Sequence, residues 1–253
     1  WHAALFPTGR SGMYKVIVGG WRDDSTGSMQ VVSGGLGKEK VHFQAPEASH
    51  IEQEMRTFLQ WFNQKNETDS LLNAAIAHLW FVTIHPFEDG NGRITRAITD
   101  MVLTKSENNV QRFYSMSSQI EKERKDYYYI LEATQKGTLD ITNWLFWFLN
   151  CLKRAIISSD KVVNKVLFKH QFWNIHNNKQ LNKRQIKIIN LLLDNFVGKL
   201  KTSKWAKINK CSSDTALRDI QDLIAKNILK KEAQGGRSTN YELVDKIPNV
   251  IDN

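Results

Sequence analysis

The chain of 253 residues contains only two cysteines and no long hydrophobic run, and each absence narrows the class of protein. Cys151 and Cys211 form no C-x-x-C motif, so we expect reduced thiols and a cytoplasmic protein. No pair of Cys or His residues has the ligand spacing of a zinc site. The most apolar stretch, residues 141–157, is interrupted by Asn150, Lys153 and Arg154, so we expect no membrane span.

A secretory signal is also absent, and the chain begins with Trp1 rather than Met, which suggests a fragment of a longer polypeptide. Hydrophobic residues make up 41% of the chain, with eight Trp and twelve Phe, which predicts a well-filled core. The length allows one large domain or two smaller ones.

Charge is distributed unevenly. The formal net charge is +9, and residues 180–253 hold 14 Lys and Arg against 8 Asp and Glu, a net of +6. A basic C-terminal part favours an acidic partner such as nucleic acid. A solvated lysine-rich surface is the alternative, with about equal weight.

Residues 85–96, with the sequence HPFEDGNGRITR, connect two apolar helical runs at 71–84 and 94–103. A glycine-punctuated loop at a helix start is a predicted anion site, because free N–H groups and the positive end of the helix dipole converge there. Gly90 and Gly92 allow close approach of a phosphate. Arg93 and Arg96 are three residues apart, so one helical face presents both to phosphate oxygens.

Two further residues of this segment carry chemistry. Asp89 supplies a hard oxygen ligand beside the predicted phosphates, where Mg²⁺ binds in many nucleotide sites. The pKa of a histidine suits proton removal near neutral pH, so His85 is the predicted base. An inert loop between two core helices is the alternative, but it leaves this concentration of charged residues without a packing reason.

The segment resembles the signature of the Fic family, H-P-F-x-D/N-G-N-G-R-x-x-R, at all nine specified positions. The resemblance implies a mainly α fold with a small β-hairpin flap, and transfer of AMP from ATP onto a protein hydroxyl. It implies that His85 is the base, that Asp89 holds Mg²⁺, and that Arg93 and Arg96 hold the β- and γ-phosphates. Asn91 and the N–H groups near Gly90 and Gly92 would stabilise charge on the transferring phosphoryl group.

The resemblance also assigns residues outside the signature. Residues 40–44 form a short extended run that corresponds to the flap, where Val41, His42 and Phe43 are the candidates for binding a target segment by strand addition. The His42 side chain itself fits an exposed loop histidine better. Tyr128 and Gln135 match the positions of adenine contacts, although packing explains the tyrosines of this region about as well.

Helical periodicity continues to about residue 175, and the polar segment 176–180 follows. We therefore predict a Fic-like domain at 1–175 and a second domain at 176–253. The second domain has three amphipathic helices and then a hairpin, which resembles a winged helix-turn-helix module with Arg237 at the wing tip. DNA binding and protein docking are equally open for it.

The predicted function is a Mg²⁺-dependent protein adenylyltransferase that acts on a Ser, Thr or Tyr hydroxyl. Removal of AMP, transfer of another phosphate-containing group, and a DNA-binding regulator with a nucleotide sensor are the alternatives. Fic relatives often carry an inhibitory S/T-x-x-x-E-G/N helix. Ser238 and Glu242 match the S/T-x-x-x-E spacing, but Leu243 follows them and they lie in the predicted hairpin, so we reject this match. We therefore expect that helix upstream of Trp1 or in a partner, with auto-modification as a consequence; a homodimer stays open.

Overall fold

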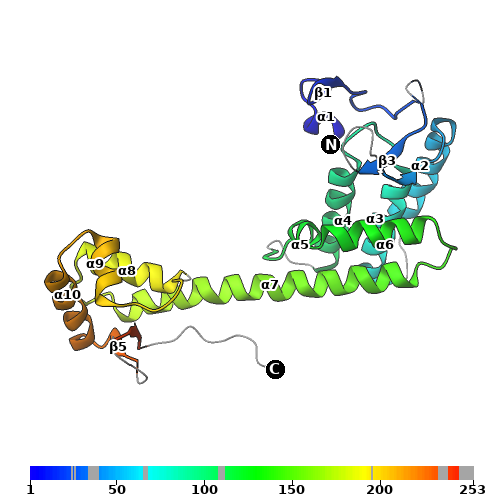
Figure 1. Cartoon of the computed structure of the whole chain (residues 1–253). Helices are drawn as coiled ribbons and strands as arrows, with labels where there is room; N and C mark the ends of the chain where they lie inside the picture. The colour runs from blue at the N-terminus through cyan, green and yellow to red at the C-terminus, as the bar shows by residue number, and fades with distance from the viewer. Residues whose placement is uncertain are drawn as a thin grey trace. The chain divides into compact units, whose positions relative to one another are not determined.

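The structure is a computed structural model that describes residues 1–23, 25, 27–33, 40–64, 68–107, 112–194, 196–232 and 239–244. The chain divides into two compact units, Trp1–Ser159 and Asp160–Asn253. Figure 1 traces the chain through both units, which are described separately below.

The first unit is built from helices, which confirms the prediction of a mainly α fold. The unit also contains the first part of a long helix that continues into the second unit. The helices are α1 (His2–Leu5), α2 (Ala48–Asn63), α3 (Ser70–Ile84), α4 (Asn91–Glu107), α5 (Met116–Lys122), α6 (Arg124–Gln135) and α7 (Thr142–Ile175).

Helix α3 is the central helix of this unit. Its sequence has no polar face, and eight of its residues are buried, as expected for a helix surrounded by others. The Asp69 carboxylate caps its start by accepting a hydrogen bond of 2.8 Å from the Leu71 N–H. One side of α3 shares a core with α6 and α7, and the other side shares a core with α2 and α4. The end of α3 is therefore held rigidly, and His85 follows it directly.

Two small hairpins accompany these helices: β1 (Arg10–Ser11) pairs with β2 (Tyr14–Lys15), and β3 (Gln30–Ser33) pairs with β4 (Lys40–Gln44). The sequence analysis predicts the extended run at 40–44 but not its partner strand β3, which has only four residues between Gly- and Ser-rich flanks. Its strand conformation comes from pairing with β4, which sequence periodicity does not reveal.

The second unit contains α8 (Lys183–Leu193), α9 (Thr202–Asn209), α10 (Ser213–Ala225), β5 (Leu229–Lys231) and β6 (Tyr241–Leu243), in the predicted order. Asn182 and Gln185 form a capping box at the start of α8, and Ser212 caps α10. Helix α9 starts without a side-chain cap, because its N-cap residue is Lys201, which makes no capping hydrogen bond. The winged-helix assignment stays a prediction, and Arg237 lies outside the described residues.

Helix α7 begins in the first unit and ends in the second. The division by packing falls after Ser159, whereas the predicted domain boundary at 175 and 176 lies at the end of this helix. The boundary stays a prediction. Among the described residues, the helices are too short or too polar to cross a membrane.

Candidate active site

His85 lies at the C-terminal end of α3 in a left-handed backbone conformation, with φ 51° and ψ 57°. Few residues other than glycine adopt this conformation, so the surrounding structure must hold it. The Nδ1 atom lies 3.1 Å from the Val82 carbonyl oxygen. A carbonyl oxygen can only accept, so Nδ1 carries the hydrogen and Nε2 is left as a proton acceptor. This is the tautomer that a general base requires.

The environment of His85 favours its neutral form. Burial lowers the pKa of His85 below its usual value, and the positive charge of Arg22 lowers it further. The hydrogen bond to Val82 and the Asp89 carboxylate act in the opposite direction but are outweighed. His85 is therefore neutral and able to take a proton at pH 7.

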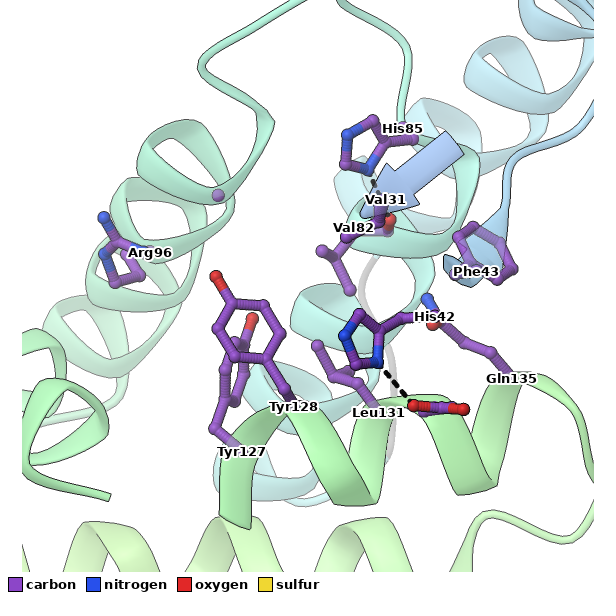
Figure 2. A pocket seen from close by; sticks show the side chains of 12 residues that line it. Val31, His42, Phe43, Val82, His85, Arg96, Tyr127, Tyr128, Leu131 and Gln135 are labelled. Atoms are coloured by element: carbon purple, nitrogen blue, oxygen red, sulfur yellow. Dashed lines mark hydrogen bonds and ion pairs between the residues drawn. The ribbon is translucent and has the colours of Figure 1, made fainter. Parts of the chain in front are cut away.

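A cavity of about 120 Å³ opens beside His85 (Figure 2). It is bounded by β3 and β4 of the hairpin, by the end of α3, by the first turns of α4 and by α6. Seven of the predicted site residues line it: His42, Phe43, His85, Gly92, Arg96, Tyr128 and Gln135. The other five, Val41, Asp89, Gly90, Asn91 and Arg93, are not among its lining residues.

Asn91 braces the loop from within. Its side-chain nitrogen donates to the Phe87 carbonyl at 2.6 Å, and its side-chain oxygen accepts from the Phe87 N–H at 2.9 Å. Asn91 is 2% exposed, and Phe87 packs into the core of α2, α3 and α4. Both polar atoms of the side chain thus bind the loop, and the prediction that Asn91 stabilises the transferring group stays a prediction.

Asp89 faces the N-terminal segment. Its carboxylate accepts hydrogen bonds from the Ser11 hydroxyl and, at 2.5 Å, from the Gly90 N–H, and it pairs with Arg93 at 3.3 Å. Burial alone would raise the pKa of Asp89, but these hydrogen bonds and the Arg93 charge outweigh it and lower the pKa. Gly90 has φ +84°, and a Cβ there would lie 3.0 Å from the Phe6 ring, so glycine is required.

Asp89 fits a Mg²⁺ site in which substrate phosphates and water supply most of the ligands. The described residues contain no group of three or more acidic, histidine or cysteine side chains that could hold a metal by themselves. Mg²⁺ usually binds through one or two carboxylates, with substrate phosphates and water completing the octahedron. The Asp89 carboxylate is ionised and 44% exposed, so it fits that arrangement.

Arg93 and Arg96 differ in their surroundings. The Arg93 guanidinium is 44% exposed, pairs with Asp89 and lies 4.8 Å from the centre of the Phe6 ring. Arg96 lines the cavity, close to Gly92, where a Cβ would be 3.5 Å from the Arg96 Nη1. Within the described part of the chain, no ion pair involves Arg96.

The flap hairpin is attached to α6. The His42 Nδ1 lies 2.6 Å from one carboxylate oxygen of Glu132, a contact drawn as a dashed line in Figure 2. The other carboxylate oxygen of Glu132 lies 2.8 Å from the Lys136 Nζ. The interpretation of His42 as an exposed loop histidine is therefore wrong, because its ring is half-buried and joins β4 to α6. Val41 is 42% exposed, whereas Phe43 lines the cavity.

One face of α6 forms the floor of the cavity. Tyr128, Glu132 and Gln135 follow each other at spacings of four and three residues, so they share this face. Tyr128 is 39% exposed, and the Gln135 amide donates to the Thr83 hydroxyl at 3.0 Å. This spacing was the signal that would have identified Glu132, which the sequence analysis missed.

His78, two turns before His85 on α3, is fully buried below the cavity. Its ring nitrogens bind the Thr99 hydroxyl at 2.9 Å and the Tyr127 hydroxyl at 3.0 Å. Burial lowers the pKa of His78 to about 3, with a smaller contribution from the Arg96 charge. It is a neutral core histidine.

Three residues from the N-terminal segment position the signature loop and were missed by the sequence analysis: His2, Ser11 and Arg22. The His2 Nε2 donates to the Asp89 carbonyl at 3.1 Å, and its ring stacks on Phe87 at 4.2 Å between centroids. The Arg22 Nε donates to the His85 carbonyl at 2.8 Å. These contacts span 63 to 87 residues, and no local pattern encodes them.

Fold and site together define a helical domain with a glycine-containing loop at the start of α4 and a buried, neutral histidine beside it. Residues 1–103 match the model of the Fic/DOC family, and this part of the chain is a Fic domain. The chain is 30% identical over 104 residues to protein adenylyltransferase Fic of Drosophila mojavensis, covering 40% of this chain and 19% of that protein. It is 32% identical over 59 residues to protein adenylyltransferase fic-1 of Caenorhabditis elegans, covering 22% and 12%.

The chain therefore spans about a fifth or less of the length of these relatives. A crystal structure of a Fic family protein from Desulfovibrio desulfuricans G20 is similar in fold, with a TM-score of 0.50 and 21% identity. That similarity covers 97% of this chain and 67% of the other chain.

Proposed function

We propose that this chain transfers AMP from ATP to a hydroxyl group of a protein. The observation that carries the proposal is the pairing of a neutral His85, whose Nε2 is available, with Arg96 and Gly92 across one cavity. The family match and the names of the relatives support the same class of reaction. A neutral base next to a cationic anion site suits removal of a proton from a hydroxyl that attacks phosphorus.

Each bond that forms or breaks in this reaction, and the proton that moves, is accounted for as follows. A Ser, Thr or Tyr hydroxyl oxygen of the target attacks the α-phosphorus of ATP and forms the new O–P bond. The bond from the α-phosphorus to the bridging oxygen breaks, and pyrophosphate leaves with the electron pair. Nε2 of His85 takes the hydroxyl proton. Arg96 and the N–H groups at the start of α4 hold the phosphate charge.

Mg²⁺ would be held by Asp89 and would neutralise charge on the leaving pyrophosphate when bound. Arg93 is placed beside Asp89 rather than at the cavity, so it would reach the phosphates only by leaving Asp89 and Phe6. We therefore assign the main phosphate contact to Arg96 and a supporting one to Arg93.

The cavity size bears on where ATP lies. A cavity of about 120 Å³ holds only part of a nucleotide, because ligand sites usually measure roughly 300–1,000 Å³. A groove of about 860 Å³ shares Val31, His42, Tyr128 and Glu132 with the cavity and continues beside Tyr129. We propose that phosphates occupy the cavity while the adenosine extends past Tyr128 into this groove.

The target segment would pair with the exposed side of the flap hairpin. Val32 and Val41 are paired across β3 and β4 and are 50% and 42% exposed, so they offer an apolar surface next to the cavity. Addition of a target strand at this hairpin would bring its hydroxyl toward His85. We also propose that the chain can modify itself and can form a homodimer. The second unit would dock DNA or a protein.

The test is incubation of the chain with ATP labelled at the α-phosphate, Mg²⁺ and a cell extract. Label on protein supports transfer, and its loss in His85→Ala but not in His50→Ala assigns the base, since His50 is an exposed residue of α2. Binding of duplex DNA without label would favour the regulator instead. Release of AMP from a pre-modified protein would favour the removal reaction.

A further inference from the structure

Arg22 is buried at the junction of His85 and the flap hairpin. The residue is 3% exposed although arginine is almost never fully buried. Its Nε donates to the His85 carbonyl at 2.8 Å, and its Nη2 donates to the Pro46 carbonyl. Its backbone N–H donates to the Pro86 carbonyl at 2.9 Å. One residue therefore binds the carbonyl groups of two consecutive residues, His85 and Pro86.

The two ends of this contact have different functions. His85 lies at the end of α3, where helix carbonyls lack partners within the helix, and its left-handed backbone needs support. Pro46 follows β4 and precedes α2, next to Ala45, whose N–H binds the Met29 carbonyl at 2.9 Å before β3. The guanidinium thus joins the backbone of the base to the foot of the hairpin.

We propose that Arg22 is a positioning residue that fixes His85 relative to the flap, and so aligns the base with a hydroxyl presented by the target. This inference rests on the proposed AMP transfer. A planar guanidinium with several fixed donors can join two carbonyls of different elements, whereas an ammonium presents a single point charge. The planar guanidinium of Arg22 then fixes the backbone of His85 relative to the hairpin that would present the target hydroxyl. The groups that face the His85 ring are Arg22 and Asp89, with Arg96 and His42 across the cavity.

The test compares Arg22→Lys and Arg22→Met in the full chain, with Arg56→Met as control. Arg56 lies on the exposed side of α2, where it is 61% exposed and paired with Glu52. Arg22→Lys keeps the charge but loses the planar guanidinium that binds two carbonyl groups. The kcat should therefore fall roughly 10- to 100-fold while KM for ATP stays unchanged. Arg22→Met also removes the charge that lowers the pKa of His85, so that pKa should rise. Arg56→Met should change neither quantity.

The pKa of His85 is measured by NMR of its imidazole without nucleotide, so it needs no transfer activity. If the wild-type chain transfers no AMP, the proposed function fails, whereas a pKa that rises in Arg22→Met alone still supports the contact with His85. The proposal would be overturned if both folded variants kept the wild-type kcat and if Arg22→Met also kept the wild-type pKa of His85. Failure of both variants to fold would also overturn it, because Arg22 would then be needed for the fold itself.

Discussion

The signature segment has two sides with opposite surroundings. One side faces the cavity, where His85, Gly92 and Arg96 meet the flap and α6. The other side faces the N-terminal segment, where Asp89 and Arg93 contact Ser11 and Phe6. Arg93 and Arg96 are three positions apart on the same helix, yet Arg93 is 44% exposed and ion-paired while Arg96 lines the cavity.

This difference shows that a motif match does not assign equal roles to its members. An exposed ion pair contributes little to stability, about 0–1 kcal/mol, and can rearrange easily. A cation at a partly closed cavity is screened less by water, so it interacts more strongly with a phosphate. The cavity side is therefore suited to chemistry, and the opposite side to anchoring the loop and to supplying a carboxylate.

The largest expected effect lies on the cavity side. His85→Ala should lower kcat by roughly 10²- to 10⁴-fold, the usual cost of removing a general base. Binding of ATP, measured by calorimetry, should persist because Arg96 and the N–H groups of α4 are untouched. Transfer at the wild-type rate by this variant would remove His85 from the mechanism.

The pH dependence of the wild-type chain sharpens the same assignment. Burial lowers the pKa of His85, so its neutral form persists below the usual histidine value of about 6.5. The rate should therefore stay level between pH 8 and about pH 6.5 and fall only at more acidic pH. A decline that begins above neutral pH would contradict a neutral His85.

The two arginines test the comparison directly. Arg96→Met should raise KM for ATP by about 10- to 100-fold, as expected for loss of a hydrogen bond between charged groups. Arg93→Met should change it by less than about fivefold, because Arg93 is held at the exposed side. Equal losses in the two variants would break the distinction between the sides.

Substitution of His78 tests the buried core near Arg96. Its pKa is lowered to about 3 by burial, so the folded chain resists its protonation while the unfolded chain binds a proton near pH 6.5. The contribution of neutral His78 to stability is complete above about pH 6.5 and is lost as pH falls toward about 3. Between pH 7 and pH 5, the free energy of unfolding measured with urea should fall by roughly 2 kcal/mol less in His78→Gln than in the wild type. His50→Gln should behave as the wild type.

A moderate effect is expected for Asp89, the proposed metal ligand. Asp89→Asn should raise the Mg²⁺ concentration needed for half-maximal rate by about tenfold, because one carboxylate ligand is lost. Ser11→Ala is the matched control, since it removes a hydrogen bond to Asp89 but keeps the carboxylate. Equal Mg²⁺ requirements in Asp89→Asn and the wild type would exclude Asp89 as the ligand.

Local sequence patterns predicted the helical elements well and the strands less well. The unbroken apolar run before His85 predicted a buried helix, and α3 is one. Asp69 and Ser212 belong to residue types that commonly cap helices, and they cap α3 and α10. The strand β3 escaped because a strand of four residues has no detectable periodicity without its partner. Likewise, nothing near Glu132 in the sequence indicates that it binds His42, ninety residues away.

The sequence by itself determined the family, the helical fold and the set of residues that carry charge at the start of α4. Those properties depend on residue type and short spacing, which the chain encodes locally. Only the tertiary structure decided which arginine faces the cavity, that Asn91 braces the loop, and that Arg22 holds the backbone of His85. These outcomes depend on contacts between residues 4 to 63 positions apart, where packing rather than propensity selects the partner.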